Sequence, residues 1–153
     1  MGIRRPLRVR VAACICDGDE ILLVEHEKGD RRYWLLPGGG VEEDETLTAA
    51  LQREVLEETG FHVDGGRLVV GCEAIQPDSR HLLNLIFAAT VTAGTLTPGR
   101  DGVICDATWC PQDRLLGLEL YPAIATEIVD AWREDFGGNV RFLGNVWRDA
   151  PKK

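Results

Sequence analysis

The sequence lacks a long run of apolar residues. No stretch approaches the roughly 20 apolar residues that a membrane-spanning helix needs. The N-terminal segment carries Arg4, Arg5, Arg8 and Arg10, but it has no apolar stretch of the length found in signal peptides. We therefore expect a cytoplasmic protein that has no membrane partner.

Positive charge is also scarce. The chain has 17 Lys and Arg residues against 25 Asp and Glu residues, which gives a net charge of −8. A surface of this charge repels the phosphates of nucleic acids, so we expect no nucleic-acid polymer among the partners. A small phosphate-containing ligand would need a cation to mediate its binding.

Metal-binding cysteine motifs, repeats and linkers are absent as well. The cysteines form none of the short-spaced Cys or Cys/His pairs that bind zinc. They lie in apolar, strand-like segments and are best interpreted as buried thiols in a reducing compartment; they are Cys14, Cys16, Cys72, Cys105 and Cys110. Since 153 residues suit one domain, the sequence predicts a single domain over residues 1–153.

The pattern of apolar residues predicts strands interrupted by two helices. Strand patterns cover residues 8–16, 20–25, 67–75, 82–92 and 102–110. Helical patterns cover residues 46–59 and 121–136. The turn Asp17-Gly18-Asp19 should join the first two strands as a hairpin, and residues 28–32 should form a charged loop. This order of elements fits an α/β (α+β) fold with a mixed sheet packed between helices.

Three glutamates lie on an unexpected side of the helix predicted over residues 46–59. On a helical wheel, one apolar stripe consists of Leu47, Ala50, Leu51 and Val55, and the opposite side of Thr48, Gln52, Leu56 and Thr59. Glu54 and Glu58 fall inside the apolar stripe, and Glu57 lies on its edge. Like charges at these spacings on an inward face are destabilising unless they are neutralised.

Either a bound cation or a buried network of Arg and Lys residues could neutralise these carboxylates. Arg53 is the only basic residue in this helix, and one positive charge does not balance three negative charges. Carboxylate oxygens suit Mg²⁺, Mn²⁺ or Ca²⁺ better than zinc. The preceding Gly38-Gly39-Gly40 allows the backbone to approach a ligand closely. We therefore expect a metal site between this glycine loop and the helix.

Residues 39–61 match a known motif at every fixed position. Gly39, Glu45 and the run from Arg53 to Phe61 follow G-x5-E-x7-R-E-U-x-E-E-x-G-U, where U is apolar. This pattern resembles the signature of the Nudix (MutT-like) hydrolase superfamily. The neighbouring segments Leu36-Pro37-Gly38 and Ala107-Thr108-Trp109 are similar to the family's usual surroundings of the motif.

The resemblance implies a fold, an activity and roles for individual residues. Nudix proteins are α/β/α sandwiches that hydrolyse a nucleoside diphosphate linked to another group, with Mg²⁺ or Mn²⁺ as cofactor. By this resemblance Glu54, Glu57 and Glu58 would bind the metal, with the Gly39 carbonyl as a further ligand. Arg53 and Glu45 would pair and hold the loop in register with the helix. Many relatives form homodimers, and no feature of this sequence decides the matter.

The resemblance leaves the general base open. Glu57 and Glu54 are the candidates inside the motif. Outside it the candidates are Glu73, Asp101 and Glu119, each of which is equally interpretable as an ordinary surface acid. Many relatives have a glutamate in the loop before the Trp-containing strand, and this chain has only Asp101, Gly102 and Val103 there.

The substrate is indicated only by weak signals. Pro77, 16 residues beyond the motif, resembles a proline of the ADP-ribose pyrophosphatase subgroup, but it could equally form a turn. Trp34 and Tyr33 could stack on a base or belong to the core. Arg31, Arg32 and His81 could contact phosphate or ribose, or be solvated.

We expect a small nucleoside diphosphate derivative as the ligand, first ADP-ribose or a related ADP-sugar that yields AMP and a sugar phosphate. The first alternative is a MutT-like enzyme that converts nucleoside triphosphates to the monophosphate and pyrophosphate. A Nudix domain that binds nucleotides without cleaving them is the alternative from another class. Such domains generally lack one or more of the motif's glutamates, and this chain has all of them.

Overall fold

The computed structural model describes residues 5–99 and 104–149. Its elements, in chain order, are β1 (Leu7–Cys14), β2 (Cys16–Asp17), β3 (Glu20–Lys28), β4 (Arg31–Leu35), β5 (Gly38–Gly40), α1 (Leu47–Thr59), β6 (Phe61–Ile75), β7 (His81–Gly94), β8 (Ile104–Pro111), α2 (Gln112–Leu115), β9 (Leu120–Tyr121), α3 (Ala125–Arg133) and β10 (Arg141–Asn145). No helix among these residues is both long and apolar enough to cross a membrane.

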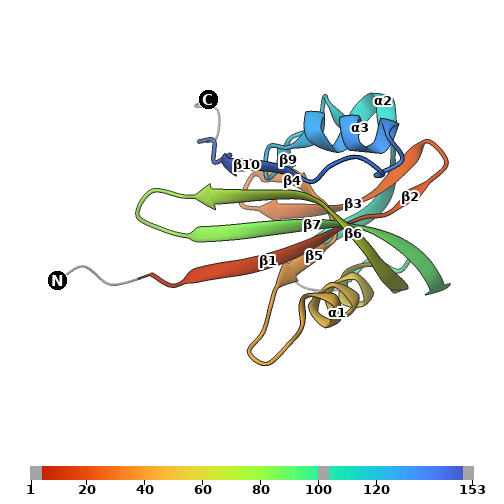
Figure 1. The fold of residues 1–153 in the computed structure, drawn as a ribbon, viewed down its shortest axis with the longest axis horizontal. Coiled ribbons are helices and arrows are strands. Elements are labelled where there is room, and N and C mark those ends of the chain that lie inside the picture. The colour runs from red at the N-terminus through yellow and green to blue at the C-terminus, as the bar shows by residue number, and fades with distance from the viewer. Residues whose placement is uncertain (1–4, 100–103, 150–153) are drawn as a thin grey trace.

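The strands form two mixed sheets. One has the order β10-β6-β7-β1-β5, and in the other β2, β3, β4 and β9 follow one another while β8 also pairs with β3. In the first sheet β1 runs parallel to β7 and antiparallel to β5. Figure 1 shows α1 on one side of the strands and α2 and α3 on the other. The mixed α/β sandwich predicted from the sequence is confirmed.

Alternating side chains of β1 belong to two separate cores. Val11, Ala13 and Ile15 pack with Ala50, Leu51 and Val55 of α1. Ala12 and Cys14 point the other way and belong to the cluster that contains Ile124, Ile128 and Val129 of the α3 region. Because successive side chains of a strand face opposite sides, a strand buried on both faces is apolar throughout. This explains the continuous run of buried residues from Val11 to Ile15.

The first predicted hairpin is wrong in part. The expected strand over residues 8–16 is divided, because the chain passes from one sheet to the other at Ile15. Of the residues in that expected strand, the described ladder pairs only Cys16, together with Asp17, with β3. The predicted charged loop over residues 28–32 is also wrong. Strand β3 extends to Lys28, strand β4 begins at Arg31, and the two pair as a hairpin. Gly29 has a φ of 62°, as tight hairpin turns require.

The second helix is shorter than predicted. It covers Ala125–Arg133 rather than residues 121–136. Tyr121 lies in β9 and is followed by Pro122, and a residue before proline is disfavoured in helical conformation. Beyond the helix, Asp135 and Phe136 both have positive φ values, so the chain leaves the helical path. The tail then forms β10, parallel to β6, which the sequence pattern does not indicate.

Candidate functional site

The glycine loop is a short strand pressed between β1 and α1. In β5, Gly38 and Gly39 pair with Ala12 and Val11. A Cβ on Gly38 would collide with the Val11 carbonyl, and a Cβ on Gly39 would collide with the Glu54 carboxylate. Gly40 faces open space, where a Cβ would meet no atom within 4 Å. Steric room, rather than a positive φ, therefore requires glycine at the first two positions.

Helix α1 begins and ends as predicted. Its N-cap Thr46 accepts a hydrogen bond from the Ala49 backbone N–H at 3.1 Å, and Gly60 ends the helix with a φ of 78°. Two positions differ from the helical wheel. Leu47 is 38% exposed although it belongs to the apolar stripe, and Thr59, expected opposite, is fully buried. Thr59 is tolerated there because its hydroxyl donates to the Val55 carbonyl at 2.7 Å.

The three glutamates of α1 differ in their surroundings. Glu58 is only 6% exposed and accepts a hydrogen bond from the Gly38 backbone N–H at 3.2 Å. The Glu54 side chain is 16% exposed and lies against Gly39. The Glu57 side chain is 53% exposed. The inward position of Glu54 and Glu58 and the edge position of Glu57, expected from the wheel, are therefore observed.

Arg53 connects the glycine loop, the following loop and the helix. Its Nε donates to Glu45 Oε1 at 2.7 Å and its Nη2 to Glu45 Oε2 at 3.0 Å, a bidentate pair. Nη2 also donates to the Gly40 carbonyl at 3.1 Å. Nη1 lies 2.8 Å from Glu54 Oε1 and 3.4 Å from Glu57 Oε2. The guanidinium therefore has the geometry to hold loop and helix in register.

These hydrogen bonds shift the pKa values of both partners of the pair. The bond from Arg53, followed by that from the Glu42 backbone N–H, lowers the pKa of Glu45 from 4.5 to about 2. The same contact raises the pKa of Arg53. Both groups are therefore charged throughout the neutral range.

The shift of Glu45 predicts how the pair responds to acid. Because the pKa is lower in the folded state, the pair stabilises the protein fully above pH 4.5, and the stabilisation is lost as the pH falls towards 2. We expect the difference in unfolding free energy between the wild type and Glu45→Gln to be constant above pH 4.5 and to shrink below it. Chemical denaturation across this range measures it, with the exposed Glu43→Gln as control. A difference that does not change with pH would contradict the assignment.

A second prediction concerns Arg53 itself. Arg53→Ala removes the contacts to Glu45, Glu54 and the Gly40 carbonyl. We expect turnover to fall about 10- to 100-fold, as is typical when a residue that orients ligating groups is lost. Arg53→Lys should recover little, because lysine cannot form the bidentate pair. Arg133→Ala, which breaks an exposed pair with Asp130, is the matched control. Normal turnover of Arg53→Ala would show that the register role is wrong.

The donor set fits a hard divalent cation. Glu54, Glu57 and Glu58 lie three and four positions apart on α1, and the Glu54 carboxylate lies beside the Gly39 backbone, which has no side chain to fill the space. In the arrangement observed for residues 5–99 and 104–149, no three acidic, His or Cys side chains lie close enough together to hold an ion. Arg53 binds Glu54 and Glu57 instead. Glu57, being half exposed, is the member free to turn.

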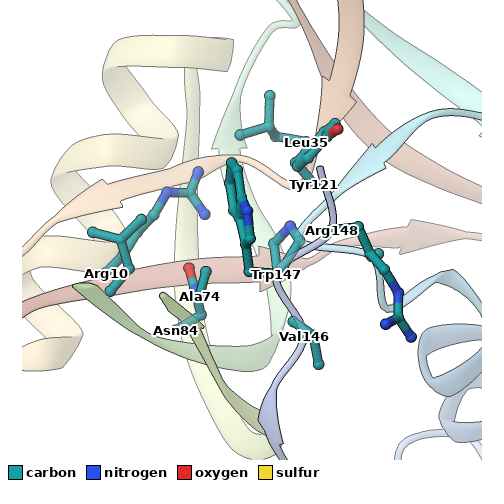
Figure 2. Close-up of a pocket in the computed structure, with 11 residues that line it drawn as sticks. Arg10, Leu35, Ala74, Asn84, Tyr121, Val146, Trp147 and Arg148 are labelled. Carbon is teal, nitrogen blue, oxygen red and sulfur yellow. The ribbon is translucent and has the colours of Figure 1, made fainter. Parts of the chain in front are cut away.

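A cavity is lined in part by Arg10, on which the charges of Glu58 and Glu54 act. We call it the Trp147 cavity; its walls include Arg10, Leu35, Leu82, Asn84, Tyr121 and Trp147. Figure 2 shows Arg10, Leu35, Ala74, Asn84, Tyr121 and Trp147 around the cavity; they come from β1, β4, β6, β7, β9 and the segment after β10. Burial lowers the pKa of Arg10, while the charges of Glu58 and Glu54 raise it. Arg10 is therefore close to both the cavity and the acidic cluster.

The residues predicted to contact substrate lie outside the Trp147 cavity. Trp34 packs against the core. Arg32 is 62% exposed and pairs with Glu25 and Glu27. His81 lies 3.0 Å from Glu73.

Pro77 lies in the turn between β6 and β7, where Ser79 N–H donates to the Gln76 carbonyl at 3.1 Å. The turn interpretation of this proline is thus the one that the structure supports. The assignment of Trp34, Arg32, His81 and Pro77 to substrate stays a prediction.

The acids proposed outside the motif have other partners. Glu119 pairs with Arg31, which also contacts the Tyr121 hydroxyl and ring. Glu73 pairs with His81. Asp101 lies outside the described residues. Glu54 and Glu57, the candidates inside the motif, pair with Arg53, so the choice of the base stays a prediction.

The sequence could have indicated one of the two main residues of the Trp147 cavity but not the other. Arg10 gives a signal, because it is a charge within a strand whose next five residues are buried. Trp147 gives none, because it reaches the cavity through the long-range pairing of β10 with β6.

Comparison with known proteins agrees with this geometry. The family model of the NUDIX domain matches residues 6–131. The human 8-oxo-dGDP phosphatase NUDT18 is 32% identical over 120 residues, which cover 72% of this chain and 36% of that protein. The phosphatase NudJ of Escherichia coli K12 is 30% identical over 108 residues, 71% of each chain. The chain thus spans little more than a third of the human relative's length.

A solved structure shows the same fold. The ADP-ribose pyrophosphatase of Streptococcus suis superimposes with a TM-score of 0.70 and 24% identity, covering 89% of this chain and 98% of that one. At this identity the likeness concerns the fold alone. The match of the family model over most of the chain is decisive: the chain belongs to the NUDIX domain family, the family of hydrolases that its motif predicts.

Proposed function

We propose that the chain is a Mg²⁺- or Mn²⁺-dependent hydrolase that cleaves the pyrophosphate bond of a nucleoside diphosphate or of a derivative of one. The observation that carries the proposal is the position of Arg10, which lines the Trp147 cavity and lies close to Glu54 and Glu58. A ligand could place its nucleoside in the cavity and its phosphates over the acidic cluster. Cavity and cluster would then hold two ends of one molecule.

Each residue of the cluster has a role that follows from its contacts. Glu54, Glu57, Glu58 and the Gly39 carbonyl would hold the cation. When bound, a divalent ion neutralises phosphate charge and lowers the pKa of a water that attacks phosphorus. The proton of that water would pass to a carboxylate, for which Glu57 is the best placed because its side chain is 53% exposed. Arg53 and Glu45 would keep the loop and helix aligned.

The proposed substrates differ in the group that is attached beyond the phosphates. The preference for ADP-ribose depended on Pro77, which forms a turn outside the Trp147 cavity. The human relative is named for a nucleoside diphosphate, 8-oxo-dGDP. We therefore place nucleoside diphosphates beside ADP-sugars as proposed substrates, with nucleoside triphosphates as the next class.

A product-resolved panel tests the proposal. Nucleoside di- and triphosphates, 8-oxo-dGDP, ADP-ribose, ADP-sugars and dinucleoside polyphosphates would be incubated with Mg²⁺ or Mn²⁺ in ¹⁸O-labelled water. We expect a nucleoside monophosphate from one class, no product after chelation, and one ¹⁸O atom in the product whose phosphorus is attacked. Measurable binding without any product would overturn the proposal in favour of a domain that only binds nucleotides.

A further inference from the structure

One face of the larger sheet changes from apolar to polar along its length. Ala12 of β1 and Ile86 of β7 are neighbours in the parallel pairing and belong to the core beneath α3. Two residues earlier on both strands, the same face carries Arg10 and Asn84, which are also neighbours. Two polar side chains therefore occupy positions that the strand pattern would fill with apolar residues.

Arg10 and Asn84 both face the Trp147 cavity, and Arg10 also lies close to Glu58 and Glu54. Both line it, opposite the aromatic side chains of Tyr121 and Trp147. Asn84 is only 2% exposed. Among residues 5–99 and 104–149, neither side chain forms a hydrogen bond to the protein. Buried polar groups in proteins are nearly always hydrogen-bonded, so Asn84 is suited to a ligand that supplies its missing partner, and the partly exposed Arg10 lies next to it.

The chemistry of the two side chains distinguishes between purines. A guanidinium has donors and no acceptor, whereas a carboxamide has both. Guanine and hypoxanthine present the acceptors O6 and N7 side by side, a pair that arginine binds with two hydrogen bonds. Adenine places an amino donor where O6 would be, so that two donors would face each other. Aromatic walls accept any purine, so Arg10 is the group that discriminates.

We propose that Arg10, with Asn84 beside it, makes the Trp147 cavity selective for nucleotides of 6-oxopurines, guanine and hypoxanthine, over those of adenine. The inference rests on the proposed function, since it assigns the nucleoside to this cavity. The position of Asn84 supports a nucleobase, rather than a phosphate, as the group that Arg10 binds. It lies on the β7 side of Arg10, whereas Glu54 and Glu58 contact Gly39 and Gly38 of β5, the strand on the other side of β1.

Equilibrium binding of GMP, IMP and AMP to the full chain tests the inference by isothermal titration calorimetry, with and without Mg²⁺. We expect GMP and IMP to bind about tenfold more tightly than AMP, the effect of one good bidentate contact. IMP lacks the 2-amino group of GMP, so equal binding of the two assigns the discrimination to O6 and N7. Equal binding of all three nucleotides to the wild type would overturn the inference without any variant.

Two variants locate the effect. Arg10→Gln should reduce the preference to within about twofold, because glutamine can donate to O6 or accept from an amino group. Arg8→Gln makes the same change two residues away, where Arg8 is exposed and outside the cavity, and should keep the preference. If Arg10→Gln weakened the binding of all three nucleotides equally, Arg10 would contact the phosphate. That result would overturn the inference that Arg10 recognises the base.

Binding and turnover keep this inference separate from the proposed function. A chain that binds GMP selectively but yields no product in the substrate panel contradicts the hydrolase proposal alone. A chain that hydrolyses guanine and adenine nucleotides equally, and binds their monophosphates equally, contradicts the inference alone. Thermal unfolding of Arg10→Gln accompanies the titrations, and Arg10→Lys, which keeps the charge but loses the bidentate geometry, should show an intermediate preference.

Discussion

Glu57→Gln is expected to lower kcat by roughly 10²- to 10⁴-fold, the range typical of losing a group that transfers a proton in the transition state. Glutamine keeps the size of the side chain but carries no charge and accepts no proton at neutral pH. The Glu57 side chain is 53% exposed and, within the described part of the chain, makes only a long contact of 3.4 Å to Arg53, so the thermal unfolding temperature should change little.

Steady-state kinetics across a range of Mg²⁺ concentrations check this expectation. If Glu57 acts mainly as a ligand, the Mg²⁺ concentration for half-maximal rate rises; if it acts mainly as a base, kcat falls at saturating Mg²⁺. Glu43→Gln is the matched control, because Glu43 is exposed and lies in the same loop-helix region outside the motif's fixed positions. Turnover of Glu57→Gln close to that of the wild type would remove Glu57 from both roles.

The second large effect is expected in the glycine loop. Gly39→Ala would bring a Cβ into the Glu54 carboxylate, which is the end of a flexible side chain and can move aside. The protein should therefore fold, but with Glu54 displaced from the position that we propose for a metal ligand. We expect a loss of turnover of about 10- to 100-fold, with a small change in unfolding temperature.

The neighbouring glycines provide controls of opposite kinds. Gly40→Ala meets no atom within 4 Å and should be nearly neutral. Gly38→Ala would press against the Val11 backbone carbonyl, which cannot move aside, so it should lower the unfolding free energy by about 1–3 kcal/mol. Equal turnover of Gly39→Ala and Gly40→Ala would contradict the steric account of Gly39.

Local signals account for what the sequence predicts well. Thr46, Gly60 and the apolar spacing of Ala50, Leu51 and Val55 fix α1, and with it the side on which Glu54 and Glu58 lie. All of these signals act within about one helix length, so the sequence contains them in one window. The motif from residue 39 to 61 belongs to the same window.

Long-range pairing accounts for what the sequence does not predict. The change of sheet at Ile15 depends on which strands β1 and β3 meet, not on the residues between them. The Trp147 cavity gathers residues from β1, β4, β6, β7, β9 and the tail, which only the completed fold brings together. Trp34 and Pro77, which lie closer to the motif in the sequence, are not among the residues that line this cavity.

The separate origins of cavity and cluster have an evolutionary consequence. The groups proposed for the cleavage lie on one short segment, β5 and α1, whereas the cavity draws on six separate segments. Substitutions in β7, β9 or the tail can reshape the cavity while every glutamate of α1 keeps its contacts. New specificities can thus arise by single steps in one part of the molecule, under selection that keeps the other part unchanged.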